Sequence, residues 1–386
     1  MKVAARAKIK PFEVMEAFRE AERLQTEGKD ILHLSLGQPG TPPPREVKEA
    51  LINAIEQQPL GYTDARGILP LRQKISEHYK KRYKVTVPAE QIFITIGSSS
   101  ALLLSLLAAF DAGDKIALAR PCYPAYPNIL KAMDLETVFI DTDESTSFQP
   151  TLEQIKRCKD LKGIILSSPS NPTGTMLHEK EMKDIAEYAD AEHIRIISDE
   201  IYHGVTYGKK ASTMAKFSEH AIVTNSFSKY FLLPGWRLGW AVVPESMVRV
   251  FESLSQNFFI SPPAPSQIAA LHVFDHTDYL DKVVKTYADS REILISELSE
   301  AGLKGLGQSE GAFYLYANIS LFSNDSRTLC ERMLKEIGVC AVPGTDFDEE
   351  NGNSYIRLSY CGKPEEVRQA GRRLATWLKD FPRYIG

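Results

Sequence analysis

Cysteine is scarce in this chain of 386 residues. The five that occur are Cys122, Cys158, Cys330, Cys340 and Cys361. An odd number without a C-x-x-C pair argues against a disulfide framework and against a cysteine-based zinc site. His272 and His276 lie four residues apart on a predicted helix, but the pattern offers no third ligand and the chain has no H-E-x-x-H motif. The sequence therefore predicts no metal site, and its scattered thiols are typical of a cytoplasmic protein.

Long apolar runs are also missing. The longest, Ala101–Phe110, is interrupted by Ser105 and is too short to span a bilayer. The first residues carry charges with no apolar core behind them, which predicts no secretory signal. With 46 Lys and Arg against 50 Asp and Glu, the net charge of −4 offers no positive surplus for nucleic acid or an anionic membrane.

Short β-rich runs alternate with helix-length segments through the first two-thirds of the chain. The predicted strands are 91–96, 115–119, 137–140, 163–166, 194–198 and 221–225. Predicted helices include 45–57, 101–110 and 179–189. This alternation indicates an α/β fold, with a mostly parallel central sheet sandwiched by helices.

The two ends of the chain have a different character. A helix is predicted within 9–28, and the glycines and prolines of 37–44 predict an irregular crossing after it. Beyond Pro244 the pattern predicts a long helix over 267–298, strands over 312–317 and 354–359, and helices over 326–337 and 365–379. We therefore expect an N-terminal arm (1–40) packed on a small α+β domain (284–386), and a large domain between them (41–283).

One stretch, Thr224–Trp240, combines several groups with a shared chemistry. Lys229 lies among apolar residues, between Ser226 and Ser228, with Arg237 eight positions further on. Desolvation lowers the pKa of a lysine, and a neutral amine can form a Schiff base with a carbonyl compound. The arginine fork and the serine hydroxyls suit a phosphate. Together they predict a site for a phosphorylated carbonyl compound.

Other polar residues follow the predicted strands, where ligands gather in parallel sheets. Gly97–Ser100 joins a strand to a helix start, which favours either an anion site or an ordinary serine cap. The strand-end residues that we single out are Ser98, Ser99, Tyr123, Asn171, Asp199, Tyr202, Ser226 and Lys229.

The ordered set of motifs resembles one family. Gly97–Ala101, S-P-S-N-P-T-G (168–174), S-D-E-I-Y (198–202), S-F-S-K with Arg237, and Y-I-R-L-S-Y (355–360) are similar to class I/II aminotransferases of fold type I, which depend on pyridoxal phosphate. The resemblance runs from Leu36 to at least Tyr360. It implies an aminotransferase that moves the amino group of an L-amino acid to a 2-oxo acid by a ping-pong mechanism.

The resemblance also implies roles for matching residues. Lys229 would form the aldimine and carry the Cα proton, and Asp199 would pair with the pyridine nitrogen, which favours the electron-accepting form of the ring. Tyr202 and Asn171 would donate to the ring oxygen. The remaining cofactor contacts would be the phosphate ligands Ser98, Ser99, Ser226 and Arg237, and the stacking residue Tyr123.

For the substrate, Arg357 would hold the α-carboxylate, helped by Asn171 and the Gly37 backbone. Tyr62 matches a tyrosine that reaches the phosphate of the neighbouring subunit, so the resemblance also implies a homodimer. Related aspartate-specific enzymes place a lysine where this chain has Ser99. That difference favours a neutral or aromatic amino acid over aspartate.

Three alternatives were weighed. The same residues serve lyases of this fold, such as carbon–sulfur β-lyases, and synthases, which sequence motifs separate poorly. S-F-S-K also fits the S-x-x-K of serine acylases, but their S-D-N and K-T-G companions are missing. A cofactor-binding sensor of a transcription regulator would need a basic DNA-binding domain, for which we expect no room before the motifs begin.

Overall fold

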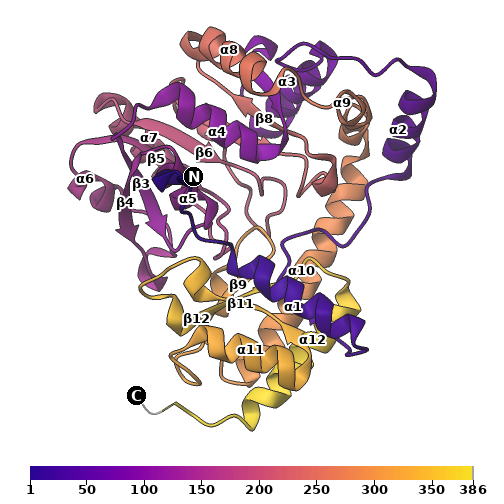
Figure 1. Cartoon of the computed structure of the whole chain (residues 1–386), viewed down its shortest axis with the longest axis vertical. Coiled ribbons are helices and arrows are strands. Elements are labelled where there is room, and N and C mark those ends of the chain that lie inside the picture. The colour runs from indigo at the N-terminus through magenta and orange to yellow at the C-terminus, as the bar shows by residue number, and fades with distance from the viewer. Residues whose placement is uncertain (385–386) are drawn as a thin grey trace.

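A seven-stranded sheet forms the centre of the structure, a computed structural model that describes residues 1–384 (Figure 1). Its strand order is β2-β8-β7-β6-β5-β3-β4. The strands are β2 (Ile92–Thr95), β3 (Lys115–Arg120), β4 (Glu136–Asp141), β5 (Leu161–Ser167), β6 (Arg195–Asp199), β7 (Ile222–Ser226) and β8 (Gly239–Val242). Six of them lie where the sequence predicts strands, and the α/β fold with a mostly parallel sheet is confirmed.

The strand that the sequence analysis did not predict is β8. It pairs antiparallel with β7 and with β2, whereas the pairs β7–β6, β6–β5, β5–β3 and β3–β4 are parallel. Two antiparallel steps cancel, so β2 runs in the same direction as the parallel strands. The carboxyl end of β2 therefore lies at the same edge of the sheet as the ends of β5, β6 and β7.

Both faces of the sheet are covered, because successive side chains of a strand point to opposite sides. Ile164 and Ile196 belong to one hydrophobic core, and their chain neighbours Ile165 and Ile197 belong to another. The first core includes residues of α3 (Leu69–Tyr83) and α7 (Glu179–Ala191). The second includes residues of α4 (Gly97–Ala109), α5 (Ala125–Ala132) and α8 (Val248–Phe259). The short helix α6 (Leu152–Arg157) packs near α7.

A smaller set of strands lies at one end of the molecule. In it, β12 (Tyr355–Ser359) pairs antiparallel with β9 (Tyr314–Asn318) and β11 (Val342–Pro343), and β1 (Leu32–His33) pairs with β10 (Val339–Cys340). Helices α11 (Ser326–Ile337) and α12 (Pro364–Lys379) pack on these strands. Helix α1 (Glu13–Thr26) packs on β10 and β11, and Figure 1 shows it in indigo against the orange and yellow elements. The boundaries 40/41 and 283/284 remain predictions.

The prediction of one helix over 267–298 is wrong, because two α-helices meet there at an angle. Helix α9 (Ala264–Ala270) packs on α2 (Arg45–Gln57), and α10 (Thr277–Glu300) packs on α12. The buried Gln267 ties α9 in place by accepting from the Ile68 backbone and donating to the Pro262 carbonyl. His272 and His276 therefore do not share one α-helix. Within residues 1–384, no helix is long and apolar enough to cross a membrane.

Candidate functional site

Several strands of the large sheet end at one edge, and the polar residues singled out from the sequence lie there. Asp199 is the last residue of β6, and Ser226 is the last residue of β7. Helix α4 begins directly after β2, and the segment 168–174 follows β5. The parallel topology thus gathers residues that are up to about 130 positions apart in the chain, as expected for ligand sites in such sheets.

Lys229 is half-buried at this edge, beside a backbone carbonyl and two aromatic rings. Its Nζ donates to the Gly37 carbonyl oxygen at 2.6 Å and lies 5.6 Å and 5.7 Å from the ring centres of Tyr202 and Phe313. Burial lowers the pKa of Lys229 to about 8, and the nearby Arg357 guanidinium acts in the same direction. A substantial fraction of this amine is therefore uncharged near neutral pH, as a nucleophile requires.

The partner of Lys229, Gly37, has no room for a side chain. A Cβ on Gly37 would fall on the hydroxyl of Tyr314. That hydroxyl is hydrogen-bonded to the hydroxyl of Tyr202 at 2.8 Å, deep in the protein. The close approach of Gly37 thus allows the backbone carbonyl and the tyrosine pair to face Lys229 together.

Asp199 is buried and has neutral hydrogen-bond partners. Its Oδ2 accepts from the Tyr126 hydroxyl at 2.7 Å, and its Oδ1 accepts from the Ile201 backbone at 3.1 Å. Burial raises the pKa of Asp199, while these two bonds and Lys229 oppose the rise. The ring of Tyr126 meets the ring of Tyr123 edge-on, with centres 5.5 Å apart. Asp199 thus has few competing cations and is free to pair with a protonated ligand nitrogen.

The start of α4 has the form of an anion site. Ser98 and Ser99 lie in its first turn, and the residue before the helix, Ile96, supplies no side-chain cap. The sequence left a serine cap open as an alternative, and the structure excludes it. Gly97 has a φ of +69°, and a Cβ there would lie 2.5 Å from Arg237 Nη2. The missing side chain lets the guanidinium approach the free N–H groups of the helix start.

Ser226 lies beside this helix start. The would-be Cβ of Gly239, its partner in β8, lies 2.7 Å from the Ser98 nitrogen, so the strand and the helix start are in close contact. The hydroxyl of Ser226 lies 2.8 Å from that of Ser228. The antiparallel β8 therefore joins the Ser226 and Arg237 segment to the N–H groups of α4.

Arg357, on β12, is buried, and no carboxylate of residues 1–384 lies close enough to form an ion pair with it. Its Nη1 donates to Asn171 Oδ1 at 3.0 Å, and its Nη2 donates to the Ser35 carbonyl at 2.5 Å. The guanidinium lies between the rings of Tyr314 and Phe347, with its carbon 4.4 Å and 4.8 Å from their centres. Its Nε has no hydrogen-bond partner. A buried cation with an unused donor is prepared for an anionic ligand.

Tyr62 is the predicted residue that stands apart. Its side chain is 84% exposed, in the segment before α3. An aromatic ring this exposed packs on nothing in its own chain. Its predicted role toward a neighbouring subunit therefore remains a prediction.

Comparison with known proteins assigns the chain to a family. The family model of aminotransferase class I and II matches residues 29–374. The chain is 42% identical to the valine–pyruvate aminotransferase of Mycobacterium tuberculosis, with 98% of each chain covered. It is 35% identical to the (5-formylfuran-3-yl)methyl phosphate transaminase of Methanocaldococcus jannaschii, with 95% and 96% covered. The crystal structure of an aminotransferase from M. tuberculosis superimposes with a TM-score of 0.96 at 41% identity, covering 98% of this chain and 99% of that one.

This chain belongs to the class I and II aminotransferases. The resemblance inferred from its motifs is confirmed, and the protein is a transaminase.

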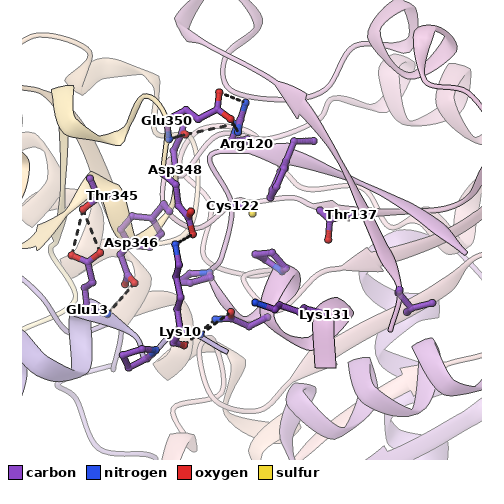
Figure 2. A pocket seen from close by; sticks show the side chains of 18 of the residues that line it. Lys10, Glu13, Arg120, Cys122, Lys131, Thr137, Thr345, Asp346, Asp348 and Glu350 are labelled. Carbon is purple, nitrogen blue, oxygen red and sulfur yellow. Dashed lines mark hydrogen bonds and ion pairs between the residues drawn. The ribbon is translucent and has the colours of Figure 1, made fainter. Parts of the chain in front are cut away.

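This aminotransferase also has a charged groove outside the crevice just described. The groove has a volume of about 780 Å³, and Figure 2 shows it between the N-terminal arm, the end of β3 and the loop 345–350. Two of its cations are paired with carboxylates of the loop: Lys10 Nζ lies 2.5 Å from Glu349, and Arg120 binds both carboxylate oxygens of Glu350 at 2.6 Å and 3.0 Å. Within residues 1–384, no three His, Cys, Asp or Glu side chains gather in a way that could hold a metal ion.

Sequence reasoning missed three residues of the aminotransferase site: Tyr126, Tyr314 and Phe347. Tyr126 comes three residues after Tyr123 in Y-P-A-Y-P, a spacing that places both on one side of a helix start. Tyr314 and Phe347 carry no local signal, because their roles depend on contacts with Tyr202 and Arg357, which lie elsewhere in the chain.

Proposed function

We propose that this aminotransferase binds pyridoxal 5'-phosphate at Lys229 and moves the amino group of a neutral L-amino acid to a 2-oxo acid in two half-reactions. The observation that carries this proposal is that Asp199 and Arg357 are buried and Lys229 is half-buried, each without a charged partner at hydrogen-bonding distance among residues 1–384. The family as a whole is pyridoxal-phosphate-dependent.

The residues fit this cofactor by their chemistry. The uncapped start of α4 and the Arg237 guanidinium over Gly97 offer donors to a phosphate, and Ser98, Ser99 and Ser226 add hydroxyls. Asp199 offers an acceptor to the ring nitrogen, and Tyr202 and Asn171 offer donors to the ring oxygen. Tyr123 offers an aromatic face. The bound cofactor would supply the aldehyde carbon that takes the amino group and a ring that accepts the electron pair left at Cα.

Lys229 has two tasks in this scheme. As a neutral amine it would hold the cofactor covalently, and once the substrate amine has replaced it, the freed amine would take up and release the proton of Cα. A pKa of about 8 suits both directions of proton transfer near neutral pH. The two half-reactions would release one 2-oxo acid, whose oxygen comes from water, and consume a second.

Arg357 fixes the substrate for this transfer. Its guanidinium would hold the α-carboxylate, with Asn171 and the Gly37 backbone beside it, and its unpaired Nε supports this role. Holding the carboxylate decides which bond at Cα stands perpendicular to the cofactor ring, and so directs the reaction toward loss of the proton.

We propose a neutral or aromatic amino acid as donor, in preference to aspartate. Ser99 occupies the place where related aspartate-specific enzymes have a lysine for the distal carboxylate. The similarity to the valine–pyruvate enzyme supports a neutral donor, whereas the furan phosphate transaminase shows that relatives at 35% identity use other substrates.

We also propose a homodimer in which Tyr62 completes the phosphate site of the neighbouring subunit. Its almost full exposure in the single chain supports this role. In the assembled dimer, a Tyr62→Phe substitution should weaken cofactor binding while the protein remains dimeric.

The test is a panel of single amino acids added to the purified protein with pyridoxal phosphate, followed by mass spectrometry of cofactor and products. Transfer of the amino group to the cofactor, release of the matching 2-oxo acid, and reversal by a second 2-oxo acid would support the proposal. Release of pyruvate and ammonia with the cofactor unchanged would instead indicate a β-lyase.

A further inference from the structure

A second cluster of polar groups lies directly behind the crevice, and the proposed function assigns it no role. It consists of Glu200, His203 and Tyr83. Glu200 follows Asp199 in the chain, and His203 follows Tyr202. The side chains of His203 and Glu200 are only 2% and 1% exposed, so their protons cannot exchange partners with solvent without local opening.

The hydrogen bonds of His203 define where one of its protons lies. Its Nε2 is 3.0 Å from the Ser168 carbonyl oxygen, which can only accept. Nε2 therefore carries a hydrogen, and in the neutral ring Nδ1 presents a lone pair. Nδ1 lies 2.9 Å from the Tyr83 hydroxyl and 3.2 Å from Glu200 Oε2.

The hydrogen bonds of Glu200 also indicate whether its carboxyl group carries a hydrogen, and on which oxygen. Its Oε1 accepts three bonds, from the Ser198 and Thr213 hydroxyls at 3.1 Å each and from the Met214 backbone at 2.8 Å. Its Oε2 accepts from no donor among the described residues and faces only His203 Nδ1. An ionised carboxylate here would place an Oε2 lone pair against the Nδ1 lone pair in a buried site, which is strongly unfavourable. A protonated Oε2 can instead share Nδ1 as an acceptor with the Tyr83 hydroxyl.

We propose that Glu200 is held as a neutral acid whose Oε2 hydrogen points at Nδ1 of a neutral His203, and that the pair positions Asn171 for the proposed transamination. The pair carries no net charge, so Asp199 remains the single anion at this strand end. Burial supports this assignment, because it raises the pKa of Glu200 to about 8 and lowers that of His203 to about 3, with Arg82 adding to the second effect.

The link to the crevice runs through the backbone. His203 Nε2–H holds the carbonyl of Ser168, the first residue of the segment that carries Asn171. Asn171 Oδ1 in turn accepts from Arg357. His203 is therefore a positioning residue. It fixes the position of the segment 168–171 relative to Arg357 and does not touch the reacting atoms.

Nuclear magnetic resonance of the full-length protein tests the proton assignment without using activity. The protein is labelled with ¹⁵N-histidine and measured with and without pyridoxal phosphate, and the His203 signals are identified by their loss in His203→Gln. We expect a neutral ring with its hydrogen on Nε2, unchanged from pH 5.5 to 7, below the pKa of Glu200. A ring protonated on both nitrogens, or one that titrates in this range, would overturn the proposal.

Two matched pairs of variants test the positioning role, which rests on the proposed function. Glu200→Gln keeps an acceptor for the three donors and an N–H for Nδ1, so we expect cofactor affinity and amino-acid KM within about threefold of the parent protein. Glu200→Ala has neither the acceptor nor the N–H. His203→Gln keeps a donor that can reach the Ser168 carbonyl, whereas His203→Leu leaves that carbonyl unpaired and should raise the amino-acid KM roughly tenfold to a hundredfold, with a smaller change in kcat.

Equal KM values for His203→Gln and His203→Leu, or a Glu200→Gln protein as defective as Glu200→Ala, would refute the positioning role. If the leucine variant does not fold, the glutamine variants and the resonance experiment still decide. A parent protein that binds no pyridoxal phosphate would refute the proposed function instead, and the resonance result would stand independently of it.

Discussion

The catalytic crevice and the groove of Figure 2 are both rich in charge, yet they use it in opposite ways. In the crevice, Asp199 and Arg357 are buried and Lys229 is half-buried, and their hydrogen-bond partners are carbonyl, amide and hydroxyl groups. In the groove, the partners of the cations are carboxylates at the surface: Glu349 and Glu350 are 66% and 68% exposed.

This difference separates charges that await a ligand from charges that already have a partner. A buried ion held by neutral dipoles keeps its full charge for an incoming ion, at a cost in stability that the surrounding fold must offset. In an exposed ion pair each charge is already neutralised by its partner, and water and salt screen what remains of the electrostatic field. The groove charges therefore hold the N-terminal arm and the loop 345–350 in place. The crevice charges are the ones available to a ligand.

The largest effect is expected from Lys229→Ala. Under the proposed function it removes both the covalent attachment of the cofactor and the proton carrier, and loss of general acid–base catalysis alone costs roughly 10²- to 10⁴-fold. Steady-state kinetics and mass spectrometry after borohydride reduction would measure the loss of turnover and of the covalent link. Lys10→Ala, which removes an exposed paired lysine of the groove, should leave kcat within about twofold. Comparable losses in both variants would erase the distinction between the two regions.

A smaller effect is expected from Arg357→Leu. Removing one partner of a buried, hydrogen-bonded charge pair costs about 2–5 kcal/mol, and here that cost should appear mainly in the amino-acid KM, with cofactor affinity little changed. Arg357→Lys should not restore binding, because an ammonium lacks the planar fork. The control is Arg327→Leu, which breaks an exposed pair with Glu13. Equal weakening of cofactor and substrate binding by Arg357→Leu would contradict its assignment to the carboxylate.

The third prediction concerns pH. In the cofactor-free protein, Lys229 is mostly neutral above its pKa of about 8, whereas an unfolded lysine stays charged to about 10.5. The rate at which a small amine-reactive acylating reagent modifies Lys229 should therefore rise with pH, with a midpoint near pH 8. Peptide mass spectrometry measures this rate, and the exposed Lys131 is the reference for the amount of reagent. Between these two pKa values the unfolded state binds more protons, so stability from this group should rise with pH. A midpoint near 10 would show that the crevice does not desolvate the amine.

The smallest effect is expected in the groove, from a double-mutant cycle of Arg120→Met and Glu350→Gln. Their bidentate pair should contribute at most about 1 kcal/mol, seen in urea unfolding at low salt. Because Arg120 also pairs with Asp141 and packs over Phe139, the single Arg120 variant should cost more than the coupling itself. A coupling that survives 1 M salt unchanged would show that the groove is less exposed to water than its surface carboxylates indicate.

Much of the sheet could be predicted from sequence, because its signals are local. Helices α2 and α11 begin and end at the predicted residues, and each of the six predicted strands agrees within about two residues at either end. The strand-end residues came together because a parallel sheet carries all its carboxyl ends to one edge. Asp199 and Ser226 lie at the ends of β6 and β7 for that reason, and their roles toward a cofactor remain predictions.

The failures share a different cause. Strand β8 is buried on both faces and begins with a glycine, so it has no alternation to detect. Contacts with residues far away in the chain define the roles of Tyr126 and Tyr314. The role of the Glu200–His203 pair depends on which of the two side chains carries a hydrogen. Neither property leaves a local sequence pattern. The break between α9 and α10 arises from the packing of α9 on α2, which overrides a continuous helical pattern.

One feature of the fold has a mechanical consequence. Helix α10, with 24 residues, spans about 36 Å as a continuous rod between the sheet and the small strands. A tilt of one degree over that length shifts the far end by roughly 0.6 Å, which exceeds the spread of good hydrogen-bond lengths. A small bend of this one helix would therefore displace α12, which packs along it, and with α12 the strands of the small sheet on which α12 packs.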